Sequence, residues 1–134
     1  MSKGKVLIID DDKDYGESLR IVLESYGFNV EQSFNIREGK ESIIREKPNL
    51  IILDVMMERM TDGFDFSREL KANPDFSSIP ILMLTAITDK TGIKYSLEED
   101  SEYLPADDYA TKPISFSDLI TKIEKLLKRA CEKK

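Results

Sequence analysis

Three uninterrupted apolar runs constrain the fold of this 134-residue chain more than any other feature of its sequence. They are Val6–Ile9, Leu50–Leu53 and Ile81–Leu84, and a polar residue closes each of them. A short run without alternation of apolar and polar residues is typical of a strand buried on both faces, as in a parallel sheet covered by helices. The runs therefore predict an α/β fold built on a parallel sheet.

Polar side chains that could bind a ligand or take part in a reaction directly follow the expected strands. The last of these strands is a short one at Asp108–Ala110. In chain order the polar residues are Asp10, Asp11, Asp12, Asp54, Thr85 and Lys112. In open α/β sheets ligands bind at the carboxyl ends of the strands. We therefore expect carboxylates, a hydroxyl and an ammonium group to meet at one edge of the sheet.

The segments between the strands carry apolar residues at helical spacing. A first helix is predicted from Leu19, Val22, Leu23 and Tyr26, with a stop at Gly27. A second strand is predicted at Phe28–Gln32. Asn35 and Glu38 resemble the cap of a second helix, which ends at Pro48 and carries Ile36, Ile43 and Ile44.

Two further helices are predicted in the second half of the chain. One is expected to begin at Asp62 and Gly63, to stop before Asn73, and to carry Phe64, Phe66 and Leu70. In the last helix Ser115 and Asp118 have the spacing of a capping box. Its apolar stripe consists of Phe116, Leu119, Ile120, Ile123, Leu126, Leu127 and Ala130.

Composition and length predict one domain over residues 1–134, with no output domain attached. The net charge of −6 argues against nonspecific nucleic-acid binding, which needs a basic surface. The single cysteine, Cys131, excludes an internal disulfide and favours a reducing compartment. No export signal and no apolar run long enough to span a membrane is present, so we expect a cytoplasmic protein without membrane contact.

The order and spacing of these motifs resemble the receiver domain of two-component response regulators, from about Lys5 to Ala130. The resemblance implies a doubly wound, flavodoxin-like sheet of five parallel strands in the order 2-1-3-4-5, with five helices. It makes Asp54 the phosphoryl-accepting residue and matches Asp10 and Asp11 to the family's acidic pair. Thr85 and Lys112 match its threonine and lysine.

Crowded carboxylates repel one another, and hard oxygen ligands suit magnesium. By the resemblance, Asp11 and Asp54 would bind Mg2+ directly, Asp10 through water, and the Met56 carbonyl would complete the protein ligands. Lys112 would hold the phosphoryl oxygens during transfer. No organic cofactor is expected.

The resemblance also implies how the signal spreads. Thr85 and Tyr109 would act as switch residues that alter the face formed by the fourth helix, fifth strand and last helix. The expected partners are a sensor histidine kinase or phosphotransfer protein and a downstream effector protein that the sequence does not name. We expect no enzymatic activity beyond the chain's own phosphoryl transfer and slow autodephosphorylation. We also expect no direct nucleic-acid binding. The chain should be a monomer or a weak phosphorylation-dependent dimer.

Three segments depart from the family pattern. The loop after Asp54 lacks the usual proline and has one extra residue. The segment Ile87–Asp107 is longer than usual and has no clean amphipathic period. The approach to the fifth strand reads Pro105-Ala106-Asp107-Asp108 in place of glycine and alanine.

Other interpretations remain open at this stage. The aspartates at 10 to 12 also fit a polar turn at a helix N-terminus, and Tyr109 also fits a core aromatic. The spacing of Asp10 and Asp12 resembles the paired aspartates of haloacid-dehalogenase-like magnesium phosphatases, although Asp14 stands where that motif has threonine or valine. A receiver-shaped interaction module that accepts no phosphate is the third alternative.

Overall fold

The computed structural model describes residues 4–54, 60–85, 108–111 and 115–132. For residues 60–65, 85, 109, 111 and 130–132 it describes the backbone alone. The expected fourth helix falls within 86–107 and therefore lies outside the described residues.

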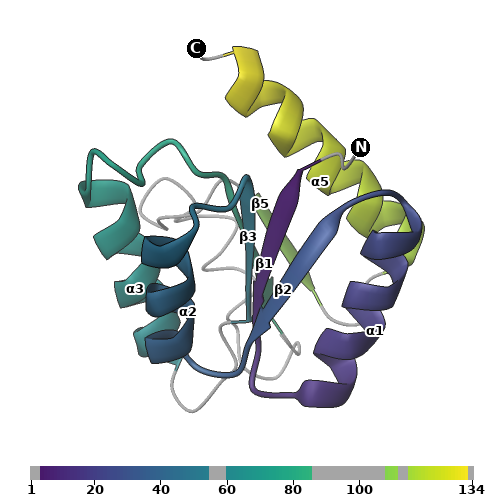
Figure 1. Ribbon diagram of the computed structural model, residues 1–134, viewed down its shortest axis with the longest axis horizontal. Helices are drawn as coiled ribbons and strands as arrows, with labels where there is room; N and C mark the ends of the chain where they lie inside the picture. The colour runs from purple at the N-terminus through teal and green to yellow at the C-terminus, as the bar shows by residue number, and fades with distance from the viewer. Residues whose placement is uncertain (1–3, 55–59, 86–107, 112–114, 133–134) are drawn as a thin grey trace.

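A five-stranded parallel sheet forms the centre of the molecule, in the order β2-β1-β3-β4-β5 (Figure 1). This order confirms the predicted doubly wound topology. The strands are β1 (Lys5–Ile9), β2 (Asn29–Ser33), β3 (Leu50–Asp54), β4 (Ile81–Thr85) and β5 (Asp108–Thr111).

Helices cover both faces of the sheet. The described helices are α1 (Lys13–Ser25), α2 (Ile36–Arg45), α3 (Met60–Ala72) and α5 (Phe116–Glu132). Helices α1 and α5 lie on one face, and α2 and α3 lie on the other (Figure 1).

The three apolar runs are buried on both faces, as their patterns predict, because successive side chains of a strand point to opposite sides. Every residue of Val6–Ile9, Leu50–Leu53 and Ile81–Leu84 is at most 1% exposed. One side of each strand packs in a cluster with Leu19, Leu23 and residues of α5. The other side packs in a cluster with Ile43, Phe66 and Leu70. The sheet is therefore the shared wall of two apolar cores.

The predicted helix caps are present. The side chain of Asn35 accepts a hydrogen bond from the Glu38 amide at 2.8 Å, and Glu38 in turn accepts one from the Phe34 amide at 3.0 Å. The Ser115 hydroxyl accepts from the Asp118 amide at 3.2 Å. Gly27 follows α1 with φ at 98°, a conformation that favours glycine.

Several predicted boundaries were wrong, since α2 ends at Arg45 instead of at Pro48 and β5 ends at Thr111 instead of at Ala110. Strand β2 spans 29–33 where 28–32 was predicted, because Phe28 turns into the core before the strand begins and is 3% exposed. Helix α3 begins at Met60, before Asp62 and Gly63.

Three apolar residues that the sequence pattern grouped with the apolar faces of helices are exposed: Tyr26 by 44%, Ile44 by 75% and Phe116 by 45%. Tyr26 lies beyond the end of α1 at its C-cap. In α2 the buried face includes Gly39 and Ser42, so the positions of the apolar residues alone did not identify the buried face of this helix. Phe116 opens α5, one turn before Ile120 reaches the core.

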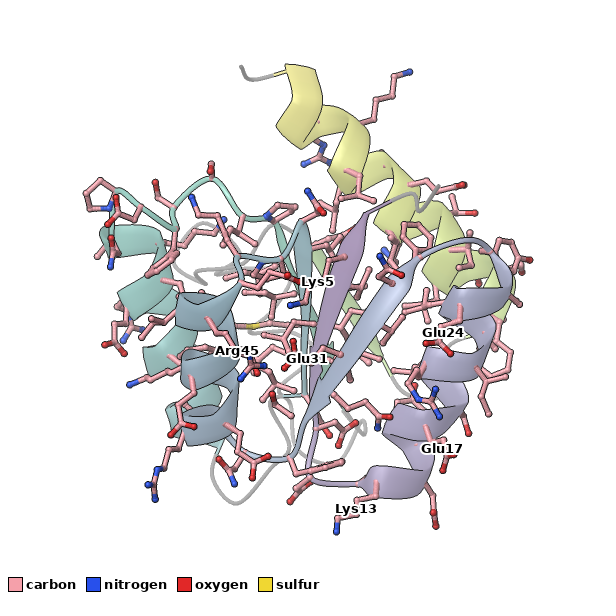
Figure 2. The ribbon with its side chains drawn as sticks, in the orientation of Figure 1. Lys5, Lys13, Glu17, Glu24, Glu31 and Arg45 are labelled. Carbon is pink, nitrogen blue, oxygen red and sulfur yellow. The ribbon has the colours of Figure 1, made fainter. Side chains whose placement is uncertain are left out.

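Charged side chains join β2 to its neighbours on the α2 side of the sheet (Figure 2). Glu31 pairs with Lys5 at 2.8 Å and with Arg45, and Lys5 also pairs with Glu46 at 2.8 Å. Burial alone would raise the pKa of Glu31, but hydrogen bonds from Lys5 and Ser42 outweigh it and hold that pKa below its usual 4.5. Burial would likewise lower the pKa of Lys5, but its bonds to Glu31 and Glu46 raise it above 10.5.

These pairs predict a pH-dependent contribution to stability. Because the pKa of Glu31 is depressed in the folded state, its stabilisation is present above 4.5 and is lost as the pH falls through the lower folded value. Glu31→Gln should reduce the free energy of unfolding by roughly 1 to 2 kcal/mol near pH 7, and the difference should vanish in acid. Urea titrations across pH measure it. Glu41→Gln, which alters an exposed pair with Arg37, is the control, and a difference independent of pH would contradict this account.

The packing of α2 on β1 leaves no room for a side chain at Gly39. A Cβ there would lie 2.5 Å from the Cδ1 atom of Ile9, which is fully buried. We expect Gly39→Ala to cost roughly 1 to 3 kcal/mol through overpacking, more than the gain of about 1 kcal/mol in helix propensity. In Gly16→Ala the Cβ would meet the flexible end of Gln32 at 2.9 Å. That variant should stay close to the parent in urea denaturation, and equal losses in both would refute the steric argument.

Candidate functional site

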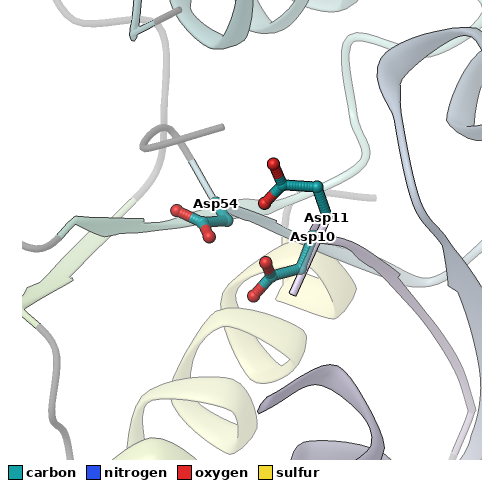
Figure 3. Close-up of side chains that lie close together, drawn as sticks. All are labelled: Asp10, Asp11 and Asp54. Atoms are coloured by element: carbon teal, nitrogen blue, oxygen red, sulfur yellow. The ribbon is translucent and has the colours of Figure 1, made fainter. Parts of the chain in front are cut away.

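The sheet brings three carboxylates together at the carboxyl ends of two adjacent strands. Ile9 pairs with Leu53 in the parallel register of β1 and β3. Asp10 follows β1 directly, and Asp54 is the last residue of β3. One carboxylate oxygen from each of Asp10, Asp11 and Asp54 lies within 4.8 Å of the others (Figure 3). We call these three residues the acidic cluster.

The three members of the acidic cluster differ in their exposure to solvent. The residues Asp10 and Asp54 are 2% and 3% exposed, whereas Asp11 is exposed to solvent. A small ion or a group carried on a projecting side chain can therefore reach the cluster from the side of Asp11.

The three consecutive aspartates have different roles. The Asp10 amide donates to the Ser33 carbonyl at 3.0 Å, and the Asp10 carboxylate accepts from the Asp12 amide at 2.9 Å. Asp12 caps α1, since its carboxylate accepts from the Tyr15 amide at 3.0 Å. The polar-turn interpretation thus holds for Asp12, whereas the Asp10 carboxylate both accepts from the Asp12 amide in this turn and belongs to the acidic cluster.

The donor set of the cluster fits a hard divalent cation. Three neighbouring carboxylates repel one another at neutral pH, and a cation bound between them removes that repulsion. Carboxylate oxygens with space for water ligands are the environment that magnesium prefers. The described residues could therefore hold such an ion.

Of the remaining predicted site residues, the structure describes only the backbone of two, Thr85 and Tyr109. Thr85 ends β4, one residue after the strand partner of Asp54, so its backbone lies at the same edge of the sheet. Tyr109 pairs in register with Met83. The side chains of Thr85 and Tyr109, and all of Met56 and Lys112, lie outside the described residues.

Two contacts beside the cluster were missed from the sequence. Lys13 opens α1, and its ammonium nitrogen lies 5.1 Å from the centre of the Phe34 ring. The Ser33 carbonyl holds the Asp10 amide. Both depend on β2 ending beside β1, and a local sequence pattern does not show that register.

Residues 6–124 match the family profile of the response regulator receiver domain. The chain belongs to this family. Receiver domains accept phosphoryl groups in two-component signalling and are generally signalling proteins rather than enzymes.

The curated relatives include regulators that are longer than this chain. The response regulator MprA of Mycobacterium leprae is 37% identical over 127 residues, which are 93% of this chain and 51% of the relative. The probable transcriptional regulator ycf27 of Porphyridium aerugineum is 36% identical over 129 residues, 96% of this chain and 50% of the relative. The chain thus spans about half the length of these curated relatives.

Solved receiver structures share the fold. The signal receiver domain of a histidine kinase from Syntrophus aciditrophicus superposes with a TM-score of 0.80 at 36% identity, covering 93% of this chain and 90% of that one. A CheY-like receiver domain protein from Methanospirillum hungatei has a TM-score of 0.80 at 26% identity, covering 97% and 98%. Among the described residues, no helix is both long and apolar enough to cross a membrane.

Repulsion within the acidic cluster predicts a stabilising substitution. In excess chelator, Asp11→Asn should raise the free energy of unfolding by roughly 0.5 to 1 kcal/mol, a rise of about 2 to 4 °C in Tm. It should also lose most of the stabilisation that magnesium gives the parent. Thermal melts with chelator and with magnesium test both effects.

Asp14→Asn is the matched control, because it removes an equal charge from the first turn of α1 outside the cluster. A carboxylate there is favourable to the helix dipole, so this variant should not gain stability. Equal or lower Tm of Asp11→Asn in chelator would count against a repulsive cluster.

Proposed function

We propose that Asp54 accepts a phosphoryl group from a sensor histidine kinase or phosphotransfer protein, with Mg2+ held by the acidic cluster. The observation that carries the proposal is the convergence of Asp54 with Asp10 and Asp11 at the carboxyl edge of the sheet. A lone carboxylate at a strand end would not need two acidic neighbours within 4.8 Å. Family membership supports the same role.

The transfer requires position and charge neutralisation more than covalent help. An oxygen of Asp54 attacks the phosphorus of the donor phosphohistidine in line with its nitrogen–phosphorus bond. The oxygen–phosphorus bond forms as that bond breaks and leaves its electron pair on the imidazole nitrogen, giving an acyl phosphate. Magnesium, when bound, neutralises the charge on the phosphoryl oxygens.

The chain's own residues then divide the remaining tasks. Asp10, Asp11 and Asp54 would hold the metal ion, with the Met56 carbonyl as a further ligand. Lys112 pairs with a phosphoryl oxygen, and the Thr85 hydroxyl donates to another. Tyr109 transmits this change to the face around β5 and α5.

We also propose that residues 1–134 work as one cytoplasmic receiver unit whose output is a protein contact, through a monomer or a weak phosphorylation-dependent dimer. The net charge of −6 favours a protein rather than a nucleic acid as the immediate partner. In the longer relatives the matching region is joined to a further segment of similar length.

The phosphatase alternative is not favoured. In that interpretation Asp10 and Asp12 would both serve the reaction. Here the Asp12 carboxylate is hydrogen-bonded to the Tyr15 amide as a helix cap, and the residue that joins Asp10 is Asp11.

The proposal predicts one phosphoryl group per chain. Incubation with acetyl phosphate and magnesium should add the mass of a single phosphoryl group, and Asp54→Ala or excess chelator should abolish that gain. Intact-mass spectrometry measures it directly. Asp75→Ala, which removes an exposed carboxylate from the turn after α3, should be modified like the parent. Full modification of Asp54→Ala would overturn the proposal.

The phosphoryl group should also be long-lived. In receivers the side chains two positions after the aspartate and two after the threonine border the path of the hydrolytic water, and here they are Met56 and Ile87. Neither can orient water, so positioning for hydrolysis is missing. Met56→Asn and Ile87→Glu should accelerate decay of the phosphorylated protein about tenfold. Decay that is unchanged or slower in both variants would exclude control by these side chains.

A further inference from the structure

Two buried serines connect the acidic cluster to the ion pairs beneath α2. Ser33 is the last residue of β2 and is 2% exposed, and Ser42 lies in α2 and is 5% exposed. Their hydroxyl oxygens are 3.2 Å apart. The Ser42 hydroxyl also donates to the carboxylate of Glu31 at 2.7 Å.

The direction of these hydrogen bonds follows from the groups involved. An ionised carboxylate only accepts, so Ser42 gives its single hydroxyl proton to Glu31. The proton between the serines must then come from Ser33. The result is a directed series from Ser33 to Ser42 to Glu31, with Glu31 held in turn by Lys5 and Arg45.

The same segment reaches the acidic cluster through the backbone. The carbonyl of Ser33 accepts the Asp10 amide at 3.0 Å, and Ser33 pairs in register with Ile9, the residue before Asp10. The contact of Gly39 with Ile9 seats α2 on the end of β1. The end of β2 is therefore fixed on one side by Asp10 and on the other by Ser42.

We propose that the hydrogen bonds from Ser33 through Ser42 to Glu31 position Asp10 for metal binding. This rests on the proposed function only in taking the ion to be magnesium. Ser33 and Ser42 touch no ion themselves and act as positioning residues. Their hydroxyls hold the carbonyl that fixes the Asp10 amide, and Asp10 in turn presents its carboxylate to the cluster.

The matched control lies on the opposite face of the same strand. Gln32 precedes Ser33, and its side-chain oxygen accepts a hydrogen bond from Arg20 at 3.0 Å. Gln32→Ala therefore removes a side-chain hydrogen bond from β2 without breaking the series that leads to Asp10. A purely structural role for Ser42 would make Ser42→Ala and Gln32→Ala behave alike.

The experiment combines two readouts on the parent, Ser42→Ala and Gln32→Ala. Amide hydrogen exchange by NMR in metal-free protein follows the Asp10 amide, and calorimetric titration with magnesium chloride gives the Kd. We expect Ser42→Ala to speed exchange at the Asp10 amide and to raise the Kd about threefold to tenfold. This rise in Kd is smaller than the one expected from removing a residue that contacts a metal ligand directly. Gln32→Ala should change neither.

Glu31→Gln provides a second variant if Ser42→Ala does not fold. It should also raise the Kd for magnesium. Unchanged exchange at Asp10, an unchanged Kd, or equal changes in Gln32→Ala would overturn the positioning role. If the parent itself bound no magnesium, the proposed function would fail. Exchange at the Asp10 amide would then decide alone whether the two serines position Asp10.

Discussion

The parallel pairing of β1 with β3 is the constraint on which the rest of the molecule depends. It places Ile9 opposite Leu53, and so brings the residues that follow each of them to one edge. Neighbouring strands lie about 4.8 Å apart, which accounts for carboxylate oxygens from two strands lying within 4.8 Å of one another. A slip of one residue would turn every side chain of a strand to the other face. Two apolar cores, one on each face, oppose that slip.

The edge strand β2 is stabilised differently from the centre of the sheet. Its α2 side carries Glu31 and Ser33, and polar partners from α2 replace the apolar contacts found over the central strands. Such partly buried ion pairs do not guarantee stability, because desolvation offsets much of their attraction. They do demand partners at defined positions, and an edge strand whose inward side is charged is less able to pair with another chain.

Local sequence signals predicted the features that depend on local physics. Continuous apolar runs identified the buried strands, and Asn35 and Ser115 identified helix starts, because a cap acts within three residues. Burial and contacts that depend on residues far apart in the sequence could not be predicted from these local signals. Ile44 was grouped with the apolar face of its helix, since nothing local shows that Gly39 and Ser42 form the buried face of α2. The hold of Ser33 on Asp10 was missed for the same reason.

If Asp54 accepts the phosphoryl group, as we propose, its burial limits the shape of the donors that can react with it. At 3% exposure its carboxylate cannot meet a flat protein surface. A phosphoryl group must arrive at the end of a slender side chain or on a small molecule, entering beside Asp11. Under that proposal, the burial of Asp54 would select donors by shape before any chemical recognition takes place, and an acyl phosphate on this residue would be sheltered from most of the nucleophiles that surround the protein.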